Sequence, residues 1–389
     1  MLAANYYTHN RSKWSRLSFD PVHNLKSNAD ETSIIRDDVS LHVRSGELAL
    51  VLCDNLWMPR PGRSASGSTR HMRVVIIGGT GHIGSFLTPR LVEAGHALTC
   101  ISRGIKQPYQ THRAWKAVTR LELDRTAEEN AGTFGERIAS LDAEVVIDLT
   151  CYRLESAKEL VETLRGRIGH LLHCGTIWVH GPSIEVPTTE EEPRKPFGEY
   201  GIRKSAIEAY LLQQAREERF PVTILHPGHL VGAGWAPINP TGNFNPEVFS
   251  TLMQGGEICL PNLGLETVHH VHVDDVAQAF MRAMEGRNVA LGESFHVVSP
   301  AALTLRGYTE RMAQYFGRPA RMRFLPWEEW RKGVTENDAT ATWDHISHSP
   351  NCSIQKARNL LGYKPRYTSI QAVRESVDWL IQKGVVRSK

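Results

Sequence analysis

The chain has 389 residues, of which 41% are hydrophobic and 22% charged, and its formal net charge is +3 at pH 7. This composition is ordinary for a globular protein, and so small a charge, with no block of Lys and Arg, argues against a nucleic-acid partner. No stretch approaches the roughly 18 consecutive apolar residues of a membrane span, so no membrane partner is expected. The six cysteines contain no CxxC pair, which fits a reducing compartment and predicts a cytoplasmic location.

Residues 1–71 differ in composition from the rest of the chain. They mix Asn, Ser, Arg and aromatic residues, and residues 59–68 have the Pro, Gly and Ser content of a linker. We therefore predict a poorly ordered N-terminal extension at 1–71, with one strand at 46–52. Because no acidic residue precedes Asp20, an organellar transit peptide is the alternative to the cytoplasmic assignment.

A glycine-rich turn follows the first clear strand. The β-branched run at 73–77 has the composition of a buried parallel strand, and a helical pattern begins at Ser85. Glycines at this junction permit a tight turn, let the backbone approach a pyrophosphate, and allow close packing of helix on strand. The phosphates would lie at the positive end of the helix. We predict a dinucleotide site formed by Gly78, Thr80, Gly81, His82, Ile83 and Gly84.

Strand and helix patterns alternate after Met72, as a doubly wound sheet requires. Strands are predicted at 73–77, 97–102, 117–121, 144–149, 170–175, 222–226 and 294–298, and helices at 85–94, 154–165, 201–218, 273–285, 303–316, 353–361 and 369–382. We predict an α/β fold with a doubly wound parallel sheet of the Rossmann type and a smaller C-terminal substrate lobe. The Rossmann core would comprise 72–230, with 267–300 returning to it, and the lobe would comprise 231–266 and 301–385.

A phenol and an amine stand four residues apart in Tyr200 and Lys204, so they share one face of the predicted helix. Tyr-x-x-x-Lys pairs often arise by chance, but this pair opens a helix downstream of the fifth predicted strand. The end of that strand carries Thr176, and Val179-His180-Gly181 follows directly. The position of the pair, more than its spacing, indicates a catalytic role.

With these motifs in order, the chain from Met72 to about Gln382 resembles an extended short-chain dehydrogenase/reductase of the NAD-dependent epimerase/dehydratase family. The resemblance places the family's glycine motif on Gly78, Gly81 and Gly84, its Tyr-x-x-x-Lys pair on Tyr200 and Lys204, its catalytic Ser/Thr on Thr176, and the acidic residue that reaches the adenine on Asp124. The family's later Pro-Gly and Val-x-Val-x-Asp elements fall on 227–228 and 271–275.

The chemistry of hydride and proton transfer explains why each of the three catalytic residues would be needed. Reducing a ketone, or oxidising an alcohol, moves a hydride at nicotinamide C4 and a proton at oxygen, and Tyr200 would handle the proton. A free phenol has a pKa near ~10, and bringing it to about 7 requires roughly 4 kcal/mol. One ammonium about 4 Å away supplies a similar amount at an effective dielectric of ~20, so Lys204 is expected to lower the pKa of Tyr200. Thr176 would hold the substrate oxygen, and the resemblance implies that Lys204 also binds the nicotinamide ribose.

The second predicted strand ends in Ser102-Arg103, where NAD-specific relatives carry an acid that binds both ribose hydroxyls. An acid would repel a 2′-phosphate, whereas Arg103 could pair with one. The sequence therefore favours NADP over NAD, with Ser102 and Arg103 at the 2′ position. A solvated loop arginine is the alternative interpretation.

Two further features of the sequence bear on which substrate and metal the chain could bind. Val268 stands where nucleotide-sugar members of the family commonly carry an Arg that grips a phosphate. Valine cannot do this, so we expect a small-molecule substrate other than a nucleotide sugar. His269, His270 and His272 suggest a metal, but no acid or cysteine at ligand spacing completes the set, and we expect no metal.

These features lead to three hypotheses. The first is an NAD(P)(H)-dependent oxidoreductase that acts on a secondary alcohol or ketone of a small molecule through Thr176, Tyr200 and Lys204. The second is an epimerase or dehydratase that retains its cofactor. The third is a non-catalytic dinucleotide-sensing or RNA-associated binding protein. The helices at 154–165 and 201–218 could also form a homodimer contact, as they do in many relatives.

Overall fold

The computed structural model describes residues 71–387 and three strands nearer the N-terminus, and the chain divides into two compact units at 1–67 and 68–389. In the first unit, β1 (Thr32–Arg36), β2 (Val39–Arg44) and β3 (Glu47–Leu52) form an antiparallel sheet in that order. β3 corresponds to the strand expected at 46–52, whereas β1 and β2 are additional to the prediction. The other residues of the predicted extension up to 70 lie outside the described part of the chain.

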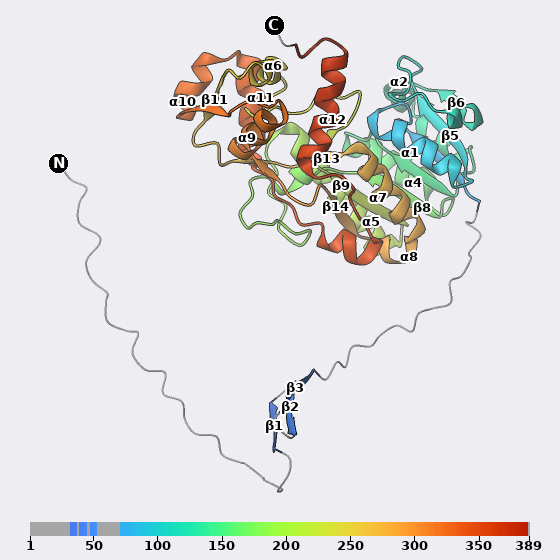
Figure 1. Ribbon diagram of the computed structural model, residues 1–389. Coiled ribbons are helices and arrows are strands. Elements are labelled where there is room, and N and C mark those ends of the chain that lie inside the picture. The colour runs from blue at the N-terminus through green and yellow to red at the C-terminus, as the bar shows by residue number, and fades with distance from the viewer. Residues whose placement is uncertain (1–31, 37–38, 45–46, 53–70, 388–389) are drawn as a thin grey trace, which may run out of the picture. The chain divides into compact units, whose positions relative to one another are not determined.

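Seven parallel strands form the central sheet of the second unit (Figure 1). In sheet order they are β14 (Ser294–Val297), β9 (Val222–Pro227), β8 (His170–Cys174), β7 (Val145–Asp148), β4 (Arg73–Ile77), β5 (Ala97–Ser102) and β6 (Thr119–Glu122). Every residue of β7 and β8 is buried, as expected for strands covered on both faces. The predicted doubly wound α/β sheet is confirmed.

Helices cover both faces of this sheet, so alternate residues of one strand enter different cores. α1 (His82–Glu93) and α7 (Val273–Glu285) pack against each other on the face that receives Val74 and Ile76 of β4 (Figure 1). The other face receives Val75 and Ile77 of β4. It is covered by α3 (Phe134–Ala139), α4 (Leu154–Leu164) and α5 (Gly198–Glu218).

A smaller lobe forms from segments that follow β9. It contains α6 (Glu247–Met253), α9 (Leu305–Tyr315), α11 (Glu336–His348), α12 (Ser369–Gln382) and the parallel pair β11 (Glu257–Pro261) and β16 (Arg321–Leu325). Phe249, Leu260 and Tyr308 lie in its core. The buried hydroxyl of Tyr308 donates to the carbonyl of Ile238 at 2.8 Å, which ties α9 to the loop that follows β10 (His229–Val231). None of the described helices is long and apolar enough to cross a membrane.

Shorter elements connect these parts. They are η1 (Arg113–Ala117), α2 (Arg125–Asn130), η2 (Ile177–His180), β10 (His229–Val231), β12 (Thr267–Val268), β13 (His270–His272), α8 (Arg287–Ala290), β15 (Leu303–Thr304), α10 (Trp327–Trp330), η3 (Arg331–Gly333) and η4 (Ala357–Leu361). β10 pairs in parallel with β13, and β12 pairs antiparallel with β15.

Several element boundaries differ from the prediction, and α1 and α5 each begin three residues earlier than expected. Residues 113–117 form η1, because Nδ1 of His112 accepts the amide of Ala114 at 3.2 Å, and β6 therefore starts two residues later than expected. The helix expected at 303–316 begins only at Leu305, since the two preceding residues pair with β12. The segment 353–361 ends in the π-helix η4 in place of a regular α-helix.

The order of the strands opens a crevice at one edge of the sheet. From β4 the chain proceeds outward to β5 and β6, and it then returns to β7 on the other side of β4. The loops at the carboxyl ends of β4 and β7 therefore diverge, and ligands of doubly wound sheets bind at this point. The glycine-rich turn leaves β4 there.

A chain that starts at Met72 is expected to fold and to bind NADPH with an unchanged Kd, because all predicted site residues lie between Gly78 and Lys204. Its melting temperature should lie within about 4 °C of that of the full chain, a change of roughly 1 kcal/mol for a protein of this size. Differential scanning fluorimetry and calorimetric titration measure both quantities. Loss of cofactor binding would show that the domain boundary is misplaced.

Candidate active site

The glycine-rich turn and the ends of β4, β5 and β7 line a cavity of about 490 Å³ at the carboxyl edge of the sheet. The fold therefore brings together residues from three strand ends, as the switch point in strand order requires. With the exception of Lys204, all residues predicted to bind the cofactor line this cavity: Gly78, Thr80, Gly81, His82, Ile83, Gly84, Ser102, Arg103 and Asp124.

The glycine-rich turn has the shape that a pyrophosphate requires. Gly78 has a φ of +88°, which favours glycine. A Cβ on Gly84 would lie 2.3 Å from the carbonyl oxygen of Gly79, so α1 approaches the turn only because residue 84 has no side chain. α1 begins after Gly81 with no side-chain cap and no acidic residue in its first turn. Its first N–H groups and its dipole are thus available to phosphates, and the turn fits a dinucleotide.

Aromatic rings enclose this turn. The ring of His82 stacks on Trp235 with 5.0 Å between centroids and 9° between planes, and Tyr109 lies 5.3 Å from His82. Burial lowers the pKa of His82 to about 4, so the imidazole is neutral at pH 7. Phosphates bound here would therefore contact main-chain N–H groups and not a positively charged imidazolium.

Arg103 and Asp124 line the cavity just beyond the ends of β5 and β6. Arg103 is exposed and lines the cavity directly after β5. Asp124 caps α2, since one carboxylate oxygen accepts the amides of Thr126 at 2.9 Å and Ala127 at 3.1 Å. This capping fixes Asp124 in the wall, and its contact with an adenine stays a prediction.

A second cavity, of about 280 Å³, is lined by the three predicted catalytic residues, Thr176, Tyr200 and Lys204. It shares wall residues with the first cavity, so the two adjoin. The shared residues are Ile83, Leu149, Tyr152, Leu230 and Trp235. The structure thus places the predicted catalytic set beside the predicted cofactor site.

Lys204 is almost completely buried, with 2% of its surface exposed. Its Nζ donates to the carbonyl oxygens of Cys151 at 2.7 Å and Cys174 at 2.8 Å, and it lies 4.8 Å from the centre of the Tyr152 ring. Burial lowers the pKa of this ammonium. The two carbonyls fix Lys204 to the ends of β7 and β8.

The phenol of Tyr200 and the side chain of Thr176 both line the second cavity. Burial raises the pKa of Tyr200, and Cys174 raises it further, whereas the side chain of Thr176 lowers it. This direction is the opposite of the expected lowering by Lys204. Burial of the phenol dominates, and the ammonium of Lys204 is directed at two main-chain carbonyls.

Thr176 stands at the end of β8 and begins η2. Its Oγ1 accepts the amide of Trp178 at 3.3 Å, and its own amide donates to Nδ1 of His226 on β9 at 2.9 Å. The main chain and the side chain of Thr176 are thus both held by the fold. The sequence pattern gives no indication of His226.

Several residues of the second cavity escape prediction because they come from separate loops and short elements with no motif of fixed spacing. They include Tyr152, Trp178, His229, Trp235 and Phe244.

The position of Glu208 beside the catalytic pair could have been predicted from the sequence. Glu208 follows Lys204 by four residues on α5, which places it on the same helix face as Tyr200 and Lys204.

Among the described residues, Asp148, Cys151 and His173 offer ligand atoms within 4.8 Å of one another. Both oxygens of Asp148 already accept Nη1 of Arg125, at 2.8 and 3.0 Å, and burial raises the pKa of the Cys151 thiol to about 12. A cation would have to displace a guanidinium and a tightly held proton, so we assign no metal to this group. His269 uses both ring nitrogens in the fold, on the carbonyl of Ser299 and the amide of Cys352.

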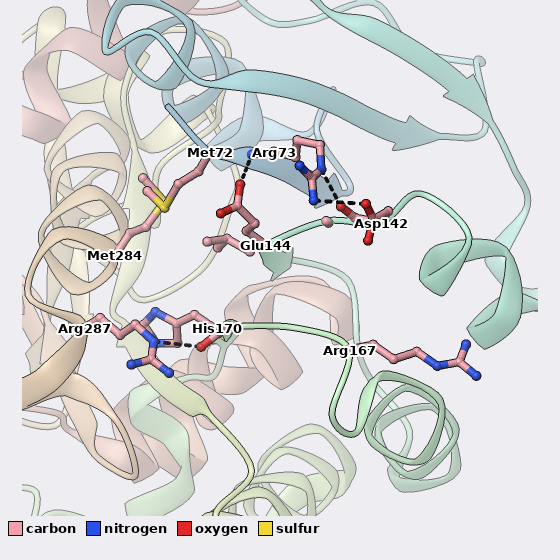
Figure 2. Close-up of a pocket in the computed structure, with 11 residues that line it drawn as sticks. Met72, Arg73, Asp142, Glu144, Arg167, His170, Met284 and Arg287 are labelled. Atoms are coloured by element: carbon pink, nitrogen blue, oxygen red, sulfur yellow. Dashed lines mark hydrogen bonds and ion pairs between the residues drawn. The ribbon is translucent and has the colours of Figure 1, made fainter. Parts of the chain in front are cut away.

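A cavity of about 400 Å³ lies at the opposite, amino end of β4, β7 and β8 (Figure 2). Nη2 of Arg73 pairs with Asp142 at 3.0 Å, and Nε of Arg287 donates to the carbonyl of Gly169 at 2.8 Å. These cations already bind groups of the cavity's own wall. We therefore place the candidate active site at the carboxyl edge of the sheet.

Residues 74–297, more than half of the chain, match the NAD dependent epimerase/dehydratase family. The chain belongs to this family. Members are NAD-dependent reductases, epimerases and dehydratases, so the expected family and enzyme class are confirmed.

Curated relatives and solved structures cover most of the chain. The chloroplast stem-loop binding protein of 41 kDa b of Arabidopsis thaliana is 24% identical over 82% of this chain and 81% of its own length. The 2′-dehydrokanamycin reductase of Streptomyces kanamyceticus is 25% identical over 71% of this chain and 76% of its own. A structure of UDP-glucose 4-epimerase from Thermotoga maritima with UDP-glucose covers 80% of this chain and 99% of that one, with a TM-score of 0.61 and 21% identity. This likeness shows a shared fold.

Several relatives are named as nucleotide-sugar enzymes. The UDP-glucose 4-epimerase of Corynebacterium glutamicum is 21% identical over 78% of this chain and 94% of its own length. Such relatives do not fit the expectation that the substrate is not a nucleotide sugar, which depends on Val268. Val268 is fully buried in the core of the C-terminal lobe and lines neither cavity of the site, so its identity says little about the substrate.

Gly84→Ala is expected to weaken NADPH binding more than tenfold, about 1.4 kcal/mol, because the new Cβ must push α1 away from the turn. Gly333→Ala is the matched control, since no heavy atom lies within 4 Å of its added Cβ. Calorimetric titration with NADPH gives both Kd values. A Gly84→Ala protein with the wild-type Kd would contradict the importance of this close packing.

Proposed function

We propose that the chain is an NAD(P)(H)-dependent oxidoreductase that acts on a secondary alcohol or ketone of a small molecule. The proposal depends on one observation: the cavity that holds Thr176, Tyr200 and Lys204 shares a wall with the cavity of the glycine-rich turn. A carbonyl held in the smaller cavity would therefore lie beside a dinucleotide held in the larger one.

The residues of the site have distinct roles in this reaction. When bound, the dinucleotide supplies or accepts a hydride at its nicotinamide ring. Thr176 would bind the substrate oxygen through its hydroxyl, next to Tyr200. Tyr200 would donate the proton in reduction, since a phenol is protonated at neutral pH. Lys204 would place a positive charge near the oxygen that becomes negative, held there by two carbonyls.

An epimerase that retains its cofactor is the second candidate, favoured by relatives named UDP-glucose 4-epimerase. The same three residues would serve either reaction, so the fate of the cofactor distinguishes the two. Net oxidation of external NADPH by a ketone supports a reductase, and product without net cofactor change supports an epimerase. The Arabidopsis relative named for stem-loop binding favours an RNA-associated role, but such a role does not require a phenol and an ammonium in one cavity.

The smaller cavity favours an uncharged reacting group. Among the residues that line it, Lys204 is the one with a charged side chain, and its ammonium already donates to two carbonyls. Tyr152, Trp178 and Phe244 supply aromatic surface. A diphosphate buried there would lack cationic partners, which is costly. We propose that the reacting part of the substrate is neutral and that any phosphate lies outside this cavity.

The preference for NADP is tested at Arg103, which is exposed at the end of β5 in the cavity wall. Arg103→Ala is expected to weaken NADPH binding by about 1–3 kcal/mol, the range for a hydrogen bond to a charged group. NADH binding should hardly change, because NADH lacks the 2′-phosphate. Fluorescence titration gives the four Kd values, and equal losses for both cofactors would remove the proposed preference.

Tyr200→Phe is expected to lower kcat at least about 100-fold without changing the Kd of NADPH, because it removes the proton donor alone. Tyr152→Phe is the matched control, since it removes another phenol from the same cavity. The assay follows NADPH oxidation by dTDP-4-dehydro-6-deoxy-D-allose or by 2′-dehydrokanamycin, ketones with and without a nucleotide that correspond to the names of two relatives. Unchanged activity in Tyr200→Phe would overturn the proposed mechanism.

A further inference from the structure

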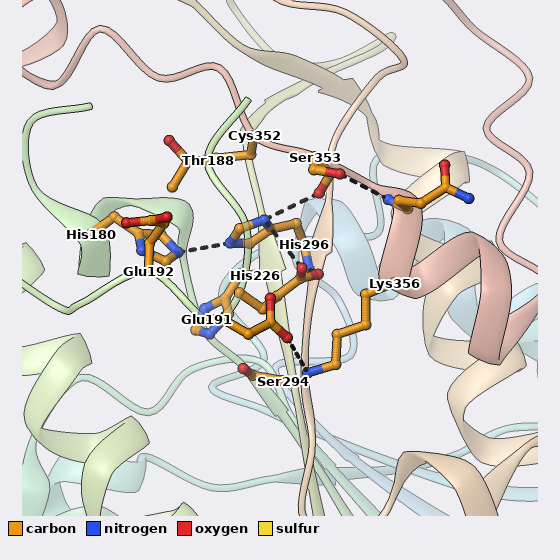
Figure 3. A network of polar contacts seen from close by, with 12 residues as sticks. His180, Thr188, Glu191, Glu192, His226, Ser294, His296, Cys352, Ser353 and Lys356 are labelled. Carbon is orange, nitrogen blue, oxygen red and sulfur yellow. Dashed lines mark hydrogen bonds and ion pairs between the residues drawn. The ribbon is translucent and has the colours of Figure 1, made fainter. Parts of the chain in front are cut away.

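Polar side chains form a network that includes three histidines (Figure 3). Two histidines on neighbouring strands belong to it: His226 on β9 and its register partner His296 on β14. His296 bonds to His180, with 2.8 Å between their Nε2 atoms. The proposed reaction uses none of these three side chains, although all are buried.

His226 connects the strand end that carries Thr176 to the helix that carries Tyr200 and Lys204. Its Nδ1 accepts the main-chain N–H of Thr176 at 2.9 Å, and its Nε2 lies 3.0 Å from Oε1 of Glu208 on α5. His226 and Glu208 are 0% and 2% exposed. The imidazole therefore spans the gap between β8 and α5 by direct contacts.

The partners of His226 determine its tautomer. A main-chain N–H can only donate, so Nδ1 must be unprotonated, and an ionised carboxylate can only accept, so Nε2 must carry the proton. Arg194 binds both oxygens of Glu208, through Nη2 at 2.7 Å and Nε at 3.1 Å. Burial alone would raise the pKa of Glu208, but the hydrogen bond from His226 and the hydrogen bonds and charge of Arg194 hold this pKa well below its usual range, so the carboxylate is ionised.

The imidazole also packs directly on the backbone of the strand end. A Cβ on Gly175 would lie 2.3 Å from Nδ1 of His226, so the ring occupies the space that a side chain would need. The hydroxyl of Thr176 is held by the amide of Trp178. A shift of the ring would therefore move the backbone of Thr176 and its hydroxyl together.

We propose that His226 is a positioning residue for the reaction. Its neutral, Nε2-protonated imidazole, held by Glu208, sets the distance between the hydroxyl of Thr176 and the phenol of Tyr200. His226 lines neither cavity, so it acts through Thr176 and does not touch the substrate. The kinetic consequence rests on the proposed function, whereas the tautomer and the two contacts do not.

Two substitutions of His226 each keep one of its contacts, with Thr176 or with Glu208, and remove the other. In His226→Asn the side-chain oxygen replaces Nδ1 as the acceptor for Thr176 but does not reach Glu208. In His226→Gln the amide replaces Nε2 as the donor to Glu208 and leaves Thr176 without an acceptor. We expect kcat for ketone reduction to fall at least tenfold in both variants, because the proposed spacing between Thr176 and Tyr200 requires both contacts of His226. KM and the Kd of NADPH should stay within twofold in both.

His170→Gln is the control for a general loss of stability. His170 is 1% exposed in the same sheet, and its Nε2 bonds to Oγ1 of Thr223, three residues before His226 on β9. This variant should melt at a lower temperature but keep its kcat. An equal loss of kcat in His170→Gln and His226→Gln, or no loss in the latter, would overturn the proposal.

The tautomer is measured without any substrate, by ¹⁵N NMR of the full chain with labelled histidine. The signals that disappear in His226→Asn should show an unprotonated Nδ1 and a protonated Nε2 at pH 7. A protonated Nδ1 would overturn the inference even if His226→Gln fails to fold. If the wild type reduces neither ketone, the proposed function fails, and the tautomer then decides the inference by itself.

Discussion

The candidate site depends on the close approach of α1 to the turn that follows β4. The carbonyl of Gly79 occupies the space of a side chain at residue 84, and the N-terminus of α1 is therefore aimed at the first cavity. The same helix binds the second half of the chain, because Nε of Arg90 donates to Asp274 of α7 at 2.7 Å. Asp274 also pairs with Arg366 before α12. α1 thus orients the cofactor turn through one contact and anchors the segments that lead to the C-terminal lobe through another.

Burial gives the site an interior with little net charge. Burial lowers the pKa values of His82 and His345 to about 4, and that of His229 well below its usual range, so these rings are neutral at pH 7. Lys204 keeps two carbonyl partners in the same region. The positive charge available to a reacting oxygen is therefore confined to one ammonium, and the surrounding rings contribute shape and polarisability.

Local sequence patterns predicted those parts of the fold that are determined by residues close together in the chain. The glycine turn and the ends of β4, β5, α7 and α12 follow from periodicity and turn chemistry. The convergence of Thr176 with Tyr200 and Lys204 could also be predicted, because each is attached to a strand end or helix start at the same edge of the sheet.

What could not be predicted depends on contacts between distant segments. His226 meets Thr176 across 50 residues of sequence, and the aromatic wall of the second cavity comes from several loops. Val268 was assigned a ligand-facing position, but β12 turns it into the core of the lobe. The direction of the pKa shift of Tyr200 depends on the burial of the phenol in the fold, which no spacing rule includes.

The arrangement of Tyr200, Lys204 and Glu208 along one face of α5 has a mechanical consequence. Successive members are four residues apart, about 6 Å along the helix axis, so the proton donor, the cation and the anchor of His226 belong to a single rigid rod. The far end of this rod is held at the surface by Arg165, which bonds to Gln214 at 2.6 Å. A tilt of α5 would move all three groups in concert relative to β8. Substitutions on the outer surface of the helix can therefore alter turnover without contacting any residue of the site.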